Sequence, residues 1–156
     1  EILNMQPDGE LHCFMRHRAV QYLRELLQGR AEIFEAHPIA LPTANPQPDI
    51  AVVRLPDTRY LQHHPYPEDI YWLVEVSDAT LTYDVETKSQ IYAAAGIREY
   101  WVIDIPSQNL IVFKDLQAGN FWTQMTLEIG RLKLIAFPEL AIDAHRLLDI
   151  PKVEME

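Results

Sequence analysis

Glu75 is an acidic residue inside a strongly apolar run, 72–76, and that pattern predicts a buried strand. An ionised carboxylate in such a strand costs several kcal/mol unless a cation or a metal compensates it. Asp49 begins a second apolar run, 49–55, and Lys88 lies in the helix-like segment that follows Glu75. Two carboxylates at neighbouring strand ends, together with a lysine, would form a divalent-metal site suited to cleaving phosphodiesters.

Antiparallel pairing of the two predicted strands would bring the carboxylates together. In such a pair the start of one strand lies beside the end of the other, so Asp49 and Glu75 would converge. Oxygen ligands of this kind suit Mg²⁺ or Mn²⁺. The main-chain carbonyl of Val76 could add a third protein ligand.

Lys88 shares a helix face with Asp84 and Tyr92, because the three residues are spaced at i, i+4 and i+8. We expect this face to turn toward the sheet, where the ammonium would compensate the carboxylates. It could also hold an attacking water or stabilise the negative charge that builds at phosphorus. The metal would lower the pKa of that water and polarise the scissile phosphate.

Each of these residues also has an ordinary structural interpretation. Asp49 follows Pro48 and could be a turn residue. Glu75 could be the buried partner of an arginine such as Arg98. Lys88 could be a solvated helix lysine, since most helical lysines are exposed. Spacing alone leaves these alternatives open.

The elements that must position the site are an alternation of helices and strands. Helical spacing predicts helices over 14–28, 83–96 and 142–148. Apolar runs and turn residues predict strands over 31–41, 49–55, 70–76, 100–105, 110–114, 121–127 and 132–137, with a proline-rich loop over 56–69. This order predicts one domain over 1–156 in the α/β or α+β class, a mixed sheet flanked by helices.

Composition limits the function classes. The chain has 13 basic and 23 acidic residues, a formal charge of -10, which works against loose, non-specific binding to nucleic acid. A local basic cleft or a bound metal would still allow such binding. No apolar run approaches the roughly 20 residues that span a bilayer, and no signal peptide is visible. A single cysteine, Cys13, excludes an intrachain disulfide, so we expect a cytoplasmic location.

Several motifs together resemble the Uma-two family, a restriction-endonuclease-like group abundant in cyanobacteria and part of the PD-(D/E)XK nuclease superfamily. The resemblance runs from about Phe14 to the C-terminus and is most specific over 72–104. The matching residues are Pro48-Asp49, Glu75-Val76-Ser77, Thr80, Asp84, Lys88, Tyr92 and the run 96–104. It implies a restriction-endonuclease-like mixed sheet flanked by helices, with metal-dependent phosphodiester hydrolysis at one sheet edge.

The resemblance assigns roles residue by residue. Asp49 matches the aspartate of the Pro-Asp element, and Glu75 matches the second acidic position; both would be catalytic and would bind the metal with Val76. The superfamily lysine two residues after Glu75 is replaced by Ser77. In the Uma-two pattern the following helix supplies the lysine, which makes Lys88 the third catalytic residue. A lysine can migrate in this way because its four-carbon stem is long and flexible.

Superfamily members often add one more acidic residue near the first helix. Glu10, Glu25 and Glu35 are the candidates, and the sequence does not choose among them. His17 could neighbour the site, although partial exposure on its helix is the more ordinary expectation.

The leading hypothesis is therefore a Mg²⁺- or Mn²⁺-dependent endonuclease acting on DNA. One alternative is a catalytically weak or inactive nucleic-acid-binding or assembly module on the same fold. Another is a structural or homo-oligomeric protein; a homodimer is also compatible with the nuclease hypothesis. The aromatic residues of the strands are expected mainly in the core, and they are Tyr100, Trp101, Phe113, Phe121, Trp122 and Phe137.

Overall fold

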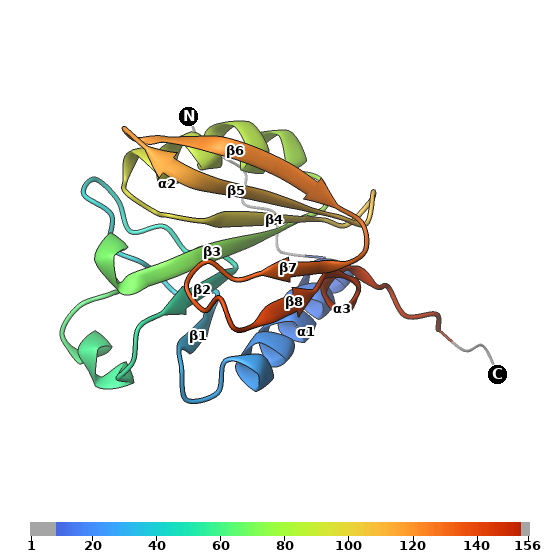
Figure 1. The fold of residues 1–156 in the computed structure, drawn as a ribbon, viewed down its shortest axis with the longest axis horizontal. Coiled ribbons are helices and arrows are strands. Elements are labelled where there is room, and N and C mark those ends of the chain that lie inside the picture. The colour runs from blue at the N-terminus through green and yellow to red at the C-terminus, as the bar shows by residue number, and fades with distance from the viewer. Residues whose placement is uncertain (1–8, 154–156) are drawn as a thin grey trace.

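A six-stranded sheet forms the centre of the protein, whose computed structural model describes residues 9–153. Its strands lie side by side in chain order (Figure 1): β1 (Glu32–Glu35), β2 (Ile50–Val53), β3 (Ile70–Ser77), β4 (Tyr100–Asp104), β5 (Asn109–Gln117) and β6 (Asn120–Leu127). Neighbouring strands are antiparallel except β3 and β4, which are parallel. A separate antiparallel pair consists of β7 (Arg131–Lys133) and β8 (Ala141–Asp143).

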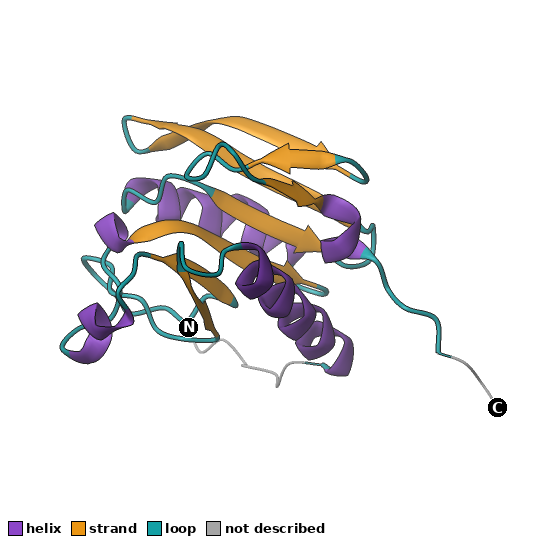
Figure 2. Cartoon of the chain, turned by 60° about the horizontal axis from the view of Figure 1, so that its bottom comes forward, coloured by secondary structure: helices purple, strands orange, loops and turns teal. Residues whose placement is uncertain are grey.

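Helices cover both faces of the sheet. Figure 2 shows the long α1 (Glu10–Leu26) in front of the strands and the crossover helix behind them. A parallel strand pair needs such a crossover, and here it consists of a π-helical segment, η3 (Tyr83–Lys88), followed by α2 (Ser89–Ala94). The remaining helices are α3 (Ala144–Leu148), which packs against α1, and two 3₁₀ segments, η1 (Asp57–Leu61) and η2 (Pro67–Asp69).

Alternation along the strands divides the apolar residues into two cores. Val74 and Trp101 face α1, α3 and the β7–β8 pair, where they join Met15 and Leu23. Leu73, which alternates with Val74, faces the opposite side and packs with Tyr92, Tyr100 and Val102. Glu75 is two residues beyond Leu73 and therefore points to the face that η3 and α2 cover.

Element boundaries differ from the sequence expectation at several places. The first helix begins at Glu10 and not at Phe14. The first strand is limited to Glu32–Glu35, because Ala36 takes a positive φ of 48° and turns the chain out of the sheet. The predicted strand 132–137 is only Arg131–Lys133. The predicted final helix 142–148 divides into β8 and α3, since the Asp143 side chain accepts a hydrogen bond from the His145 N–H and caps a shorter helix.

The prediction of a core position is wrong for Trp122, whose exposure is 70%. β6 is the last strand of the sheet, and its residues alternate between exposed and half-buried positions. Phe121 faces the α2 side and packs against Phe113, so the next residue must face outward. Among the described residues, no helix has the length and apolar character needed to cross a membrane.

Candidate active site

Asp49 lies immediately before β2, opposite the end of β3. The antiparallel register pairs Ile50 with Val74, so the next residues outward, Asp49 and Glu75, meet at the same end of the sheet. The main-chain N–H of Asp49 donates to Oε1 of Glu75 at 2.9 Å, and the N–H of Val76 donates to Oδ2 of Asp49 at 2.7 Å. Each carboxylate is thus anchored by the backbone of the other strand, and the expected convergence is present.

Glu75 is only 2% exposed, and its second oxygen is fixed by the crossover helix. Lys88 Nζ donates to Oε2 at 2.8 Å, and the hydroxyl of Tyr92 donates to the same oxygen at 2.9 Å. These two residues are four apart, so one helix face supplies both donors. Because a buried carboxylate needs such donors, the arrangement explains how an acidic residue is tolerated inside β3.

Lys88 joins the site to the start of the crossover. Its ammonium also lies 3.2 Å from Oδ1 of Asp84, and the Thr80 hydroxyl donates to Oδ2 of Asp84 at 2.7 Å. The Tyr100 hydroxyl donates to the Asp84 carbonyl at 2.9 Å, which ties the π-helical segment to β4. The Lys88 side chain remains 28% exposed, so its ammonium is held by protein carboxylates and is still reachable from solvent.

Ser77 occupies the strand position two residues after Glu75. Its side chain therefore points to the same covered face, where it is fully buried and sits 3.5 Å from the Thr80 hydroxyl. A lysine at this position would need space that the Thr80 turn occupies. Lys88 instead extends from η3, which covers this face of β3, and places its ammonium beside the Glu75 carboxylate.

The first helix contributes two basic residues that the sequence argument did not select. His12 Nε2 lies 3.3 Å from Oδ2 of Asp49, and Arg16 NH1 donates to Oδ1 of Asp49 at 3.4 Å. The two are four residues apart and share the face of α1 that passes the start of β2. Their i, i+4 spacing is the available sequence signal, but many helices carry such pairs and nothing in the sequence joins this one to Asp49.

Of the three acidic candidates near the first helix, Glu35 lies nearest to this arrangement. It accepts from Nε of Arg16 at 3.2 Å, so one guanidinium bridges Glu35 and Asp49. His17 contacts the other oxygen of Glu35 at 3.1 Å and is 56% exposed. Glu25 instead pairs with Arg146 at 3.6 Å near the far end of α1, and Glu10 is exposed at the helix start.

Burial and charge shift the ionisation of the cluster in opposite directions. Burial raises the pKa of Glu75 to about 7; Lys88 opposes this increase and the neighbouring Asp49 adds to it. Burial also acts to raise the pKa of Asp49, but hydrogen bonds from His12 and the Val76 N–H outweigh it and hold this pKa below its usual value. For Lys88, burial acts to lower the pKa, and Glu75 and Asp84 together raise it above the ordinary lysine value.

The carboxylate oxygens of Asp49 and Glu75 are suitable ligands for a hard divalent cation that takes few ligands from the protein. Within residues 9–153 no group of three or more His, Cys, Asp and Glu side chains is arranged to hold a metal. Mg²⁺, however, is commonly bound by one or two carboxylates together with waters and substrate phosphates. Oδ1 of Asp49 and Oε1 of Glu75 each accept a single hydrogen bond from the described residues, so each retains acceptor capacity.

The Val76 carbonyl is on the correct side of β3 for the same cation. The N–H and C=O of a strand residue point to the same side of the strand, and the Val76 N–H points at Asp49. β2 begins at Ile50, which pairs with Val74, so Val76 lies beyond the paired part of β2. A metal at this position would therefore have two carboxylates and one carbonyl within reach.

Arg98, the alternative ion-pair partner considered for Glu75, does not contact it. Arg98 precedes β4 and lines a cavity with Arg54 and Tyr71, at the opposite end of β3 from Glu75. A second cavity, lined by Gln108, Ile129 and His145 among others, also lies away from the Asp49–Glu75–Lys88 cluster. Neither of these two cavities has Asp49, Glu75 or Lys88 in its lining.

A mixed sheet between helices, with two acids and a lysine at one strand end, defines the restriction-endonuclease-like class. The sequence matches the Uma2 family, described as "Putative restriction endonuclease", over residues 1–145, and the chain belongs to this family. Its fold is similar to the crystal structure of a "putative nuclease belonging to DUF820" from Anabaena variabilis ATCC 29413. That similarity has a TM-score of 0.70 at 15% sequence identity, and covers 94% of this chain and 84% of the other. No curated protein matches the sequence.

Proposed function

We propose that this protein is a metal-dependent endonuclease that hydrolyses phosphodiester bonds of DNA, with Asp49, Glu75 and Lys88 as its catalytic residues. The observation that carries the proposal is the contact network around Glu75. One carboxylate oxygen meets the backbone of Asp49, and the other meets the ammonium of Lys88. Membership of the Uma2 family supports the same reaction class.

The metal is part of the proposal. Asp49, Glu75 and the Val76 carbonyl would hold Mg²⁺ or Mn²⁺, and the bound ion would lower the pKa of an attacking water and polarise the phosphate. The chain has a formal charge of -10, which disfavours binding to nucleic acid. The bound ion would supply positive charge at the site where the phosphate binds.

The side chains around the proposed metal site would have two roles, stabilising charge on the substrate and positioning the two carboxylates. Lys88 lies against Glu75 and is partly exposed, so its ammonium can orient a water or stabilise charge that develops on the phosphate oxygens. Tyr92 and the Asp49 N–H fix the Glu75 carboxylate in one orientation. Arg16 and His12 hold Asp49 from the other side, so both acids are positioned before substrate arrives.

A plasmid assay tests the proposal. Supercoiled DNA is incubated with the protein and Mg²⁺ or Mn²⁺. A Glu75→Ala variant is assayed in parallel, and Glu86→Ala, which changes an exposed glutamate of η3, serves as the control. We expect nicking by the wild type and the control, and none by Glu75→Ala or in EDTA. A parallel RNA substrate tests the preference for DNA. Equal background cleavage by wild type and Glu75→Ala on both substrates would refute the nuclease assignment.

The same protein sample can distinguish the nuclease from the alternative, a non-catalytic binding or assembly module. A protein that retards DNA in a gel, binds no divalent metal by calorimetry and cleaves nothing would be a binding or assembly module on this fold. The replacement of the strand lysine by Ser77 is the observation that favours testing this outcome.

A further inference from the structure

The cavity lined by Arg54, Tyr71 and Arg98 lies at the opposite end of β3 from the Asp49–Glu75–Lys88 cluster. It has a volume of about 680 Å³, within the range of pockets that hold small organic ligands. Tyr71 on its wall and Glu75 are four residues apart, which corresponds to roughly 13 Å along a strand. The proposed reaction uses none of the side chains that line this cavity.

The local backbone has an irregularity that turns Tyr71 toward the cavity. The register between β2 and β3 shifts there, since Val52 pairs with Trp72 and Val53 pairs with Ile70. Tyr71 is the extra residue of this bulge. Bulges of this kind re-aim a side chain and are frequent beside functional sites.

Two arginines, Arg54 and Arg98, and two glutamates, Glu68 and Glu99, line the cavity, and the arginines are its positively charged groups. The Arg54 guanidinium stacks over the Tyr71 ring at 4.8 Å and donates to the Tyr71 hydroxyl at 3.3 Å and to the Glu68 carbonyl at 2.9 Å. Arg98 is exposed and forms no ion pair with any residue in 9–153. Guanidinium groups bind phosphate well because their planar donor fork matches its oxygens.

Glu99 provides a different kind of contact in the same cavity. Its side chain is 2% exposed, and the Trp101 indole N–H donates to Oε2 at 2.6 Å. Within the described part of the chain Oε1 accepts no hydrogen bond and Glu99 has no ion-pair partner. Burial raises its pKa to about 7, against the attraction of Trp101 and Lys114. Such a carboxyl can accept from an amino or imino group of a ligand.

We propose that this cavity binds a mononucleotide, with its phosphate between Arg54 and Arg98 and the polar edge of its base against Glu99. The cavity combines an anion-binding rim with a buried hydrogen-bonding group, and a nucleotide carries the matching pair of groups. Carboxylates are established acceptors for the exocyclic amines of bases. The proposal does not rest on the nuclease assignment, because a mononucleotide contains no phosphodiester to cleave.

Isothermal titration calorimetry of the 156-residue chain in EDTA tests this proposal, with the four 5′-mononucleotides, the corresponding nucleosides and inorganic phosphate as separate probes. We expect one site for a mononucleotide with a Kd at or below about 1 mM, and weaker binding of nucleoside and of phosphate. Equal affinity for phosphate and for the mononucleotide would mean a plain anion site and would overturn the assignment. So would the absence of binding at about 10 mM of every mononucleotide.

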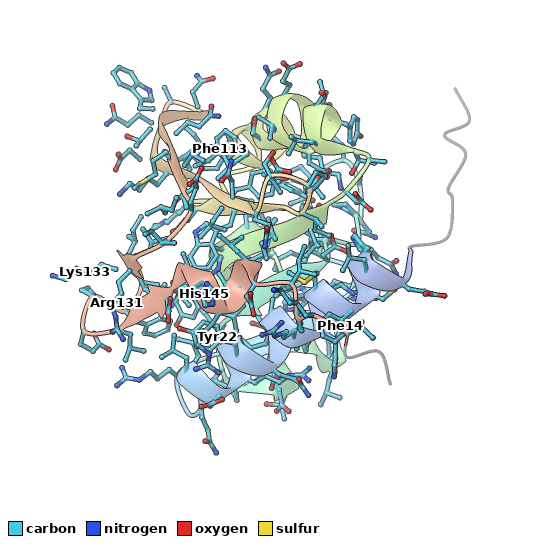
Figure 3. The ribbon with its side chains drawn as sticks, turned by 90° about the vertical axis from the view of Figure 1, so that its right-hand side faces the viewer. Phe14, Tyr22, Phe113, Arg131, Lys133 and His145 are labelled. Carbon is cyan, nitrogen blue, oxygen red and sulfur yellow. The ribbon has the colours of Figure 1, made fainter. Side chains whose placement is uncertain are left out.

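Matched variants locate the site. Arg98→Ala should weaken mononucleotide binding by about tenfold or more, because it removes a charged donor to the phosphate. Arg131→Ala, an exposed arginine that Figure 3 shows on β7 at the outer rim of the protein, should change it by less than about twofold at physiological salt. Glu99→Gln should alter the relative affinities of the four mononucleotides. Unchanged binding in Arg98→Ala, or unchanged base preference in Glu99→Gln, would contradict the proposal.

Discussion

Lys88 donates a hydrogen bond to Glu75 at 2.8 Å, although the lysine belongs to the crossover helix and the glutamate to the strand before it. The contact is possible because η3 and α2 lie on the face of β3 to which residues 73, 75 and 77 point. Lys88 follows Glu75 by thirteen residues in the chain, and its ammonium contacts the buried carboxylate. The ion pair is the feature on which the proposed chemistry depends most.

Replacing this lysine should remove activity, also when the rate is measured only on protein that circular dichroism shows to be folded. Lys88→Met keeps the length of the stem and removes the ammonium, so we expect the rate of plasmid nicking to fall by about 10²–10³-fold. Lys133→Met, on the exposed β7 position labelled in Figure 3, serves as the control and should nick at the wild-type rate. A Lys88→Met rate within about threefold of wild type would show that the ammonium is not part of the reaction.

Metal affinity should depend on pH through Glu75. Its pKa is raised to about 7 in the metal-free protein, so below that pH a proton competes with the cation for the carboxylate. We expect Mg²⁺ affinity, measured by calorimetry, to be constant above about pH 8 and to fall by about tenfold per pH unit below about pH 6. Affinity that stays constant between these values would mean that Glu75 does not bind the metal.

The same buried carboxyl should make the protein less stable at high pH. A folded-state pKa raised above the ordinary 4.5 means that folding favours the protonated form, so stability falls as the pH rises from about 4.5 to about 7. Glu75→Gln cannot ionise and avoids this loss. We expect the difference in unfolding free energy, Glu75→Gln minus wild type, to increase by roughly 1–3 kcal/mol across this range in urea titrations. A difference that does not change with pH would contradict the raised pKa.

Removal of Arg16 should have the opposite pH dependence. Its guanidinium bridges Asp49 and Glu35, and the pKa of each carboxyl lies below its ordinary value although burial acts to raise both. Arg16→Met should lower the free energy of unfolding by about 1–3 kcal/mol at pH 7. A depressed pKa stabilises above the unfolded-state value, so this loss should shrink as the pH falls through about 4.

Two controls make the Arg16 result specific. Arg131→Met, at an exposed arginine on β7, should leave stability within about 0.5 kcal/mol of wild type. Added Mg²⁺ should recover part of the stability of Arg16→Met, because a cation bound at Asp49 replaces the missing positive charge. A loss that is the same at pH 4 and pH 7 would show that Arg16 contributes through packing and not through charge.

Sequence reasoning located the strand-borne part of this site because strands follow simple rules. An acid inside an apolar run and an acid at the start of another predict two strand ends, and antiparallel pairing then brings Asp49 and Glu75 together. The placement of Lys88 came from its helical spacing with Tyr92 and from the family resemblance. The predicted mixed sheet flanked by helices is confirmed by the structural match.

The parts that sequence reasoning missed depend on contacts between distant segments. Arg16 and His12 reach Asp49 only because α1 crosses the start of β2, and no local pattern specifies that crossing. Trp122 has the composition of a core residue, and only the position of β6 as the last strand exposes it. The π-helical turn at 83–88 is held by the Tyr100 hydroxyl, which belongs to the next strand.

The most direct test of the account is whether Asp49, Glu75 and Lys88 act as one catalytic unit. Single-turnover nicking rates should be measured for Asp49→Asn, Glu75→Gln, Lys88→Met and the triple variant, after each is shown to fold by circular dichroism. Residues that act together give non-additive losses, so each single variant should fall to within about tenfold of the triple variant. Losses that multiply independently, or a triple variant that nicks DNA at the wild-type rate, would show that the three side chains do not form the catalytic centre.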